Sequence, residues 1–223
     1  MGYLYRYGRA GVMVDKEKAS YWFYRAAERG NSTAMVNLGQ MYYRGETRVG
    51  TNDEEAVRWF GQASLRGVLQ AKLNLAKCYC DGRGVVCDYG CAVRLASEVY
   101  ETGDVASSKL LGELYYTGGP CLSADPIKAV GYFEEVLNRA NKTTASGRDI
   151  VRDQREIDRV CNLTRLWLAR AYIEGRGVAR DLDRADKFIQ ETQKCQDASV
   201  VDLRKEVRKE LEFARIPTKD PGT

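Results

Sequence analysis

Four of the seven cysteines lie close enough in the sequence to suggest a zinc site. Cys78, Cys80, Cys87 and Cys91 would supply four thiolates, which can bind zinc in tetrahedral geometry. They lack the paired Cys-x-x-Cys knuckles of structural zinc sites, and the spacing of all seven cysteines is irregular. The sequence therefore predicts reduced thiols, no metal site and no cofactor.

The sequence shows no other arrangement typical of catalysis. The chain contains no histidine, which removes the most common general base. Residues 82–84 and 175–177 both read Gly-Arg-Gly, but neither segment is followed by the Lys-Ser/Thr pair of a phosphate-binding loop. We therefore expect a protein that is not an enzyme.

A repeated pattern organises most of the chain. In each copy a glycine or alanine is followed by tyrosine three positions later and by glycine three positions after that. The copies of this pattern begin at Gly2, Gly39, Ala76, Gly112 and Ala169. The first two intervals are 37 residues, whereas the last is 57 and indicates an insertion of about twenty residues.

Each copy also carries the signals of two helices. The second helix should begin after a side chain that can cap its first free amides. These predicted caps are Asp15, Asn52, Asp88, Asp125 and Asp181. Apolar residues at helical spacing then predict one buried stripe, which in the first copy is Ala19, Trp22, Phe23, Ala26 and Ala27. Glycines suited to a left-handed cap should end these helices at Gly30, Gly67 and Gly103.

The second copy resembles the Sel-one-like repeat, a relative of the tetratricopeptide repeat. The matching strings are LGQMYYRG at residues 38–45 and EAVRWFGQA at residues 55–63. The resemblance implies an all-α fold, a right-handed α/α solenoid, because two short helices per copy must stack on neighbours to bury their apolar faces. The solenoid should span residues 1–197, with copies at 1–31 (truncated), 32–68, 69–104, 105–141 and 160–197.

The two ends of the solenoid and its insertion differ in character. The first copy lacks most of its first helix, so we expect an uncovered apolar flank that a partner or further sequence would cover. Residues 198–216 predict an amphipathic capping helix, and residues 217–223 a flexible tail. Within the insertion, 142–159, residues 141–147 predict a loop, and residues 149–160 predict a charged helix that could run straight into the next repeat. The insertion is equally consistent with a binding face and with an inert surface excursion.

The resemblance also implies where partners would bind, because the first helices of each repeat, the A helices, line the concave side in this family. Their non-core positions are the candidate partner-binding residues Asn37, Gln40, Arg44, Asn74, Lys77, Leu110, Glu113, Trp167 and Arg170. We expect these rows to lie side by side. Leu110 and Trp167 could form an apolar anchor there, or Trp167 could pack under the insertion.

These observations favour a scaffold or complex subunit that binds other proteins. The alternative is a helical-repeat RNA-binding protein, suggested by the net charge of +4, although the A-helix rows are not uniformly basic. We find no apolar run long enough for a membrane helix and no signal-peptide pattern. The sequence thus predicts an intracellular, cytoplasmic protein, with an organellar location left open by the N-terminal truncation of the first repeat.

Overall fold

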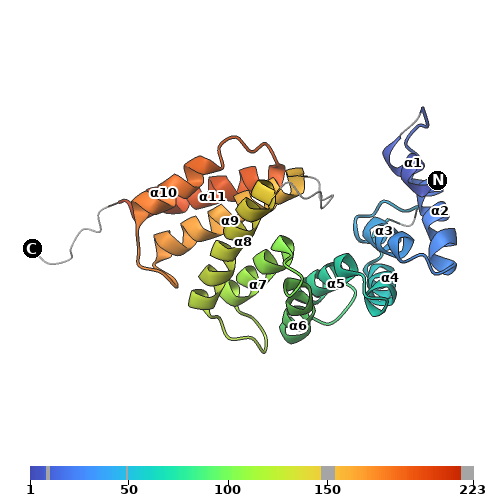
Figure 1. The fold of residues 1–223 in the computed structure, drawn as a ribbon, viewed down its shortest axis with the longest axis horizontal. Helices are drawn as coiled ribbons and strands as arrows, with labels where there is room; N and C mark the ends of the chain where they lie inside the picture. The colour runs from blue at the N-terminus through green and yellow to red at the C-terminus, as the bar shows by residue number, and fades with distance from the viewer. Residues whose placement is uncertain (9–10, 49, 147–153, 217–223) are drawn as a thin grey trace, which may run out of the picture. The chain divides into compact units, whose positions relative to one another are not determined.

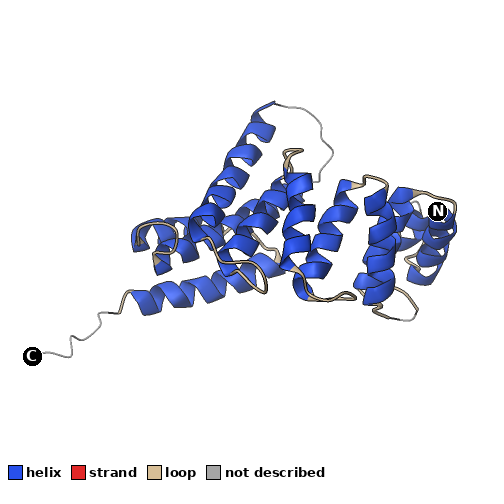
Figure 2. Cartoon of the chain, turned by 90° about the horizontal axis from the view of Figure 1, so that it is seen from below, coloured by secondary structure: helices blue, strands red, loops and turns tan. Residues whose placement is uncertain are grey.

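A computed structural model describes residues 1–8, 11–48, 50–146 and 154–216, and every regular element in these ranges is an α-helix (Figure 2). The structure divides into two compact units, Met1–Val99 and Tyr100–Thr223, each described separately below. The predicted all-α repeat solenoid is confirmed. No helix in the described ranges has the length and apolar character needed to cross a membrane.

The first unit contains three helix pairs (Figure 1). Its helices are α1 (Gly2–Tyr7), α2 (Lys16–Glu28), α3 (Ser32–Tyr43), α4 (Asp53–Leu65), α5 (Leu69–Asp81) and α6 (Tyr89–Tyr100). Helices α1, α3 and α5 are the A helices of successive repeats, and α2, α4 and α6 are the B helices. Each helix from α1 to α4 packs on the next one, and α2 and α3 share one apolar cluster with Trp59 and Ala63 of α4.

The second unit contains two further pairs and a final helix. Its helices are α7 (Val105–Thr117), α8 (Pro126–Ser146), α9 (Gln154–Glu174), α10 (Leu182–Glu191) and α11 (Ala198–Ala214). Helix α11 lies where the sequence predicts a capping helix. Its Val200, Val207 and Leu211 are buried in a cluster with α9 and α10.

The predicted helix caps are confirmed at the level of individual hydrogen bonds. Asp15 accepts a hydrogen bond from the Lys18 amide at 2.9 Å, and Asn52 accepts one from the Glu55 amide at 3.0 Å. The other three caps make the same bond, at Asp88, Asp125 and Asp181. These predictions succeed because the bond joins residues three positions apart, so the local sequence determines it.

Glycine on an A helix lets the following B helix approach closely. A Cβ added to Gly39 would lie 2.6 Å from the ring of Phe60, which is 1% exposed. Gly112 makes the same kind of contact with the ring of Phe133. The phenylalanine ring therefore occupies the space that a larger residue on the A helix would need.

The insertion differs from the predicted loop. Helix α8 continues through Ser146, so the described residues 141–146 are helical rather than a loop, because this B helix lacks the glycine that stops the others. Its later turns bury Val136 and Ala140 against Ile157 and Val160 of α9. Helix α9 begins at Gln154 and runs without interruption into the repeat, whereas the rest of the predicted charged segment, 149–153, lies outside the described residues.

Candidate protein-interaction surface

The first unit brings four of the predicted partner-binding residues around one small cavity. This cavity, of about 110 Å³, lies between α3 and α5, and we call it the A-helix groove. It is lined by Gln40, Tyr43, Arg44, Phe60, Asn74 and Lys77. The predicted residues Gln40, Arg44, Asn74 and Lys77 are therefore neighbours in the structure.

The positions of these side chains follow from the helices that carry them. Gln40 lies in the last turn of α3, and Arg44 is the residue that caps this helix. Asn74 and Lys77 are three residues apart on α5 and so project from the same face. Phe60 of α4 is almost fully buried and forms the floor.

The A-helix groove is polar and positively charged. Arg44 and Lys77 are exposed cations, and none of the six lining residues is acidic. Asn74 Oδ1 accepts a hydrogen bond from the side-chain Nε2 of Gln70 at 3.3 Å. The Nδ2 atom of Asn74 is buried and has no hydrogen-bond partner in the described part of the chain. An unsatisfied buried donor costs about 1–3 kcal/mol, so this atom is a candidate contact for a ligand.

Tyr43 closes one side of the groove and is held firmly. Its hydroxyl donates to the Asp81 carboxylate at 3.2 Å, and the Arg83 guanidinium lies over its ring at 3.7 Å. Burial, followed by the nearby charge of Asp81, raises the pKa of the Tyr43 hydroxyl. The ring therefore stays neutral and fixed at physiological pH.

Asn37 occupies the same place one repeat earlier but is engaged inside the molecule. Its side chain is buried, accepts from Arg6 at 3.0 Å and donates to the Tyr3 hydroxyl at 2.7 Å. Arg6 in turn pairs with the Glu46 carboxylate at 3.1 Å. Asn37 is thus part of the link between the first two repeats, and its predicted role as a partner contact does not fit its burial.

The predicted positions of the second unit are engaged with one another and with α11. The Trp167 indole donates to the Glu113 carboxylate at 2.7 Å, and its ring stacks on Phe133. Arg170 pairs with two glutamates of α11, Glu206 and Glu210, both at 2.8 Å.

Leu110 is only 8% exposed, and Trp167 is half-buried in a core cluster with Phe133 and Tyr116. The expected exposed apolar anchor of Leu110 and Trp167 is therefore not formed. The contacts of Trp167 are with the B helix α8 and the A helix α7, so its packing does not depend on the insertion.

A second candidate surface lies on α2. A depression of about 400 Å³, which we call the α2 face, is lined by Tyr21, Trp22, Arg25, Ala26, Arg29 and Asn31. Trp22, predicted to be part of a buried stripe, is 40% exposed, whereas its equivalent Trp59 is 1% exposed. Sequence comparison of the repeats identified the uncovered aromatic flank, but not Arg25 and Arg29.

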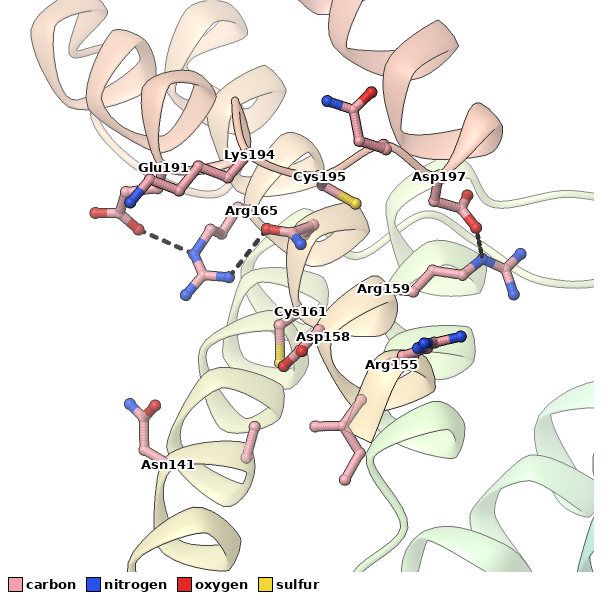
Figure 3. Close-up of a pocket in the computed structure, with 14 residues that line it drawn as sticks. Asn141, Arg155, Asp158, Arg159, Cys161, Arg165, Glu191, Lys194, Cys195 and Asp197 are labelled. Atoms are coloured by element: carbon pink, nitrogen blue, oxygen red, sulfur yellow. Dashed lines mark hydrogen bonds and ion pairs between the residues drawn. The ribbon is translucent and has the colours of Figure 1, made fainter. Parts of the chain in front are cut away.

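One depression of the second unit has arginines that are paired with carboxylates of the chain. Figure 3 shows this pocket of about 660 Å³, in which Arg159 and Arg165 face carboxylates. Arg165 donates to Glu191 at 2.9 Å, and Arg159 lies 3.4 Å from Asp197. Its cationic side chains are thus largely neutralised by the chain itself.

All seven cysteines are free thiols in the structure. Burial raises the pKa of the Cys78 thiol to about 11, so it is protonated and unreactive at neutral pH. Cys87 donates its thiol to the Cys80 carbonyl at 3.3 Å. In the described residues no three histidine, cysteine or acidic side chains come together in a group that could hold a metal ion.

Comparisons with known proteins identify the repeat. The Sel1 repeat model matches residues 1–31, 32–68, 69–89, 91–135 and 165–185. A solved Sel1 repeat protein from Oxalobacter formigenes is 26% identical, with a TM-score of 0.70 over 99% of this chain and 84% of that chain.

A second solved structure shows the fold alone. It is a protective antigen present in uropathogenic Escherichia coli strains, 24% identical, with a TM-score of 0.58 over 99% of this chain and 49% of that chain. No curated protein matches. Because the repeat model covers more than half of the sequence, the chain belongs to the Sel1 repeat family.

Proposed function

We propose that this chain is a non-catalytic scaffold that binds a partner polypeptide in the A-helix groove and on the α2 face, as an adaptor or as a subunit of a multiprotein complex. Sel1 repeat proteins generally act as protein-interaction scaffolds, which supports the general class. The observation that carries the proposal is the groove itself, where Gln40, Arg44, Asn74 and Lys77 surround one cavity.

The predicted partner-binding residues of the second unit are less suited to contact a partner. The polar groups of Glu113, Trp167 and Arg170 form bonds within the chain, and Leu110 is buried. We therefore place the partner contacts in the first unit, on Gln40, Arg44, Asn74 and Lys77. Asn37 supports that surface from inside the core.

The α2 face would receive the C-terminal end of a partner α-helix. The next repeat provides the template: Tyr24 of α2 meets the Trp59 ring edge-on with centroids 6.0 Å apart, and the Arg66 guanidinium donates to the Gly30 carbonyl at the end of α2. Trp22 and Arg29 are the equivalents of Trp59 and Arg66.

The positive charge of the α2 face also favours the C-terminal end of a helix as its ligand. The last carbonyls of a helix are unpaired and carry partial negative charge, which suits Arg25 and Arg29. A second copy of the chain docked face to face would bring the arginines of both copies together, which Coulomb repulsion disfavours.

RNA binding gains no support from the family or from the surface. The A-helix groove places two amides, Gln40 and Asn74, beside its two cations rather than a continuous basic row. In the second unit, Arg170 is paired with the carboxylates of Glu206 and Glu210. A protein ligand fits this mixed polar surface better than a phosphate backbone does.

Site-specific photo-crosslinking tests the proposal. A benzoylphenylalanine at Gln40 should capture a defined partner from native lysate, and the same probe at Lys205, an exposed position on α11, is the control. The double variant R44E/K77E should abolish the adduct formed at position 40. Equal adducts at both positions, or adducts at position 40 that survive the double variant, would overturn the proposal.

A further inference from the structure

We propose that the A-helix groove binds the side-chain carboxylate of an aspartate or glutamate of the partner, with Asn74 Nδ2 and the Arg44 guanidinium as hydrogen-bond donors. This inference rests on the proposed function and specifies the chemistry of its ligand. It depends on three observations: an unsatisfied donor, an exposed cation on the same cavity, and the equivalent asparagine one repeat earlier, whose donor is satisfied within the chain.

The unsatisfied donor is the side-chain amide of Asn74. Its Oδ1 accepts from Gln70 Nε2, which leaves Nδ2, a buried atom of this groove-lining residue, without an acceptor in the described part of the chain. Folding around a buried, unpaired N–H is unfavourable unless something else supplies the acceptor. The ligand must therefore present an oxygen or another hydrogen-bond acceptor at this position.

The charges around the cavity favour an anionic acceptor over a neutral one. The exposed cation Arg44 lines the cavity, while no carboxylate contributes to the lining. Hydrogen bonds between charged groups are roughly twice as strong as neutral ones, and a guanidinium matches a carboxylate with two parallel bonds. A cavity of about 110 Å³ suits a group as small as a carboxylate.

The equivalent site of the first repeat shows how the position is satisfied when the chain fills it itself. Tyr3, Arg6 and Asn37 stand where Gln40, Tyr43 and Asn74 stand one repeat later. There Asn37 Nδ2 donates to the Tyr3 hydroxyl and to the Thr33 carbonyl, and its Oδ1 accepts from Arg6. Arg6 in turn binds the Glu46 side chain.

That first site thus combines an asparagine, a cation and a glutamate side chain. The groove retains the asparagine, has Tyr43 in place of Arg6 and carries its own cation at Arg44, and none of its lining residues supplies a carboxylate. An acceptor for Asn74 Nδ2 is therefore the missing component, and with Arg44 beside it we commit to a side-chain carboxylate of the partner. The probes below distinguish it from a chain-terminal carboxylate.

Nuclear magnetic resonance with small blocked amino acids can test this directly on the full chain. The probes are N-acetyl-glutamate N-methylamide, its neutral glutamine analogue, N-acetyl-alanine with a free α-carboxylate, and inorganic phosphate. The blocked glutamate should shift the side-chain amide resonances of Asn74 and the Arg44 Nε resonance saturably. The glutamine analogue should bind at least about tenfold more weakly, the loss expected from removing one charged hydrogen bond.

Matched variants separate the groove from the rest of the surface. Asn74→Asp keeps the size of the side chain but replaces the donor with a carboxylate, so binding of the blocked glutamate should disappear. Arg44→Gln should weaken binding about tenfold or more. Arg94→Gln removes the same charge from α6, where the side chain is largely exposed, and should leave binding unchanged.

Three results would overturn the inference. Equal binding of the glutamine analogue would show a neutral acceptor site, and tighter binding of N-acetyl-alanine or phosphate would show a different anion. Asn74 resonances that do not respond to the blocked glutamate would place binding elsewhere. In each case, a photo-crosslink that still forms at Gln40 would contradict only the carboxylate site and remain consistent with the scaffold function. Loss of this crosslink would contradict both the carboxylate site and the scaffold function.

Discussion

The ring of Tyr24 meets the ring of Trp59 edge-on, at a centroid distance of 6.0 Å and an interplanar angle of 85°. This contact joins the B helices of the first two repeats and helps to bury Trp59 completely. Trp22 has the same position in its repeat but is 40% exposed. The same residue type at equivalent positions therefore has two different environments, and the difference can be measured.

We expect Trp59→Ala to lower the free energy of unfolding by about 3–5 kcal/mol, because it leaves a large cavity in the core of the first unit. Trp22→Ala removes a side chain that is 40% exposed and should cost less than about 1 kcal/mol. Urea denaturation followed by circular dichroism measures both values. Similar costs for the two variants would contradict the burial seen here.

The two tryptophans also show which features the sequence could predict. Helix caps at Asp15 and Asn52 depend on bonds between residues three apart, so local spacing was sufficient. The burial of Trp22 depends on a neighbouring helix, and the stripe pattern of α2 contains no information about whether that neighbour is present. Periodicity therefore predicted the correct helix but the wrong exposure for this residue.

The candidate site shows the same limit. Asn37 and Asn74 have equivalent positions in the sequence repeats. Only the structure shows that the Asn37 side chain is hydrogen-bonded to Tyr3 and Arg6. Trp167 was correctly placed on an A helix, yet its indole N–H is bonded to Glu113 from the preceding A helix. Such pairings join residues far apart in the chain, and the repeat pattern does not specify them.

The Gly-Arg-Gly segments contact the preceding repeat. Arg83 donates to the Asp53 carboxylate and to the Tyr43 carbonyl, and Gly84, at φ 71°, packs on the backbone of Asp53. Gly177 packs in the same way on Pro126 at the start of α8. The second glycine of each segment therefore serves close backbone approach.

Gly84→Ala should thus be far more destabilising than an ordinary glycine substitution at positive φ. Gly67, at φ 79°, is the matched control because a Cβ there would meet nothing within 4 Å. We expect a loss of about 1–2 kcal/mol for Gly67→Ala, from backbone strain alone. Gly84→Ala should lose at least about 2 kcal/mol more, since the added methyl group would overlap the Asp53 backbone. Equal shifts in thermal denaturation would argue against the packing role.

Arg170 attaches the final helix to the A helix α9. Its side chain is 13% exposed and pairs with Glu206 and Glu210, which are 62% and 33% exposed. Arg170→Met keeps the apolar stem but leaves two glutamates facing each other. We expect a loss of about 1–2 kcal/mol after allowance for solvent screening, and faster amide exchange in α11.

Hydrogen–deuterium exchange by mass spectrometry measures this detachment. Lys205→Met breaks a largely exposed pair with Asp202 on the same helix and serves as the control, with an expected change below about 0.5 kcal/mol. If α11 exchanges equally in both variants, the Arg170 pairs do not hold the helix in place.

The thiol of Cys78 should make stability depend on pH in the alkaline range. Burial raises its pKa from the ordinary value of 9.0 to about 11 in the folded protein, so between these values the unfolded chain loses the proton more readily. Since ionisation then favours the unfolded state, this contribution is constant below pH 9 and destabilises as pH rises toward 11. Cys78→Val should accordingly show a smaller loss of stability between pH 9 and 11 than the parent chain.

Thiol labelling provides the complementary measurement and its control. With Ellman's reagent at pH 8, the exposed Cys121 should react within the mixing time of a manual assay, whereas Cys78 should react only at the rate of unfolding. Cys121→Ser should remove the fast phase and leave the alkaline stability slope unchanged. Rapid labelling of Cys78 in the folded protein, or an identical slope in Cys78→Val, would show that this thiol is not sequestered between α5 and its neighbours.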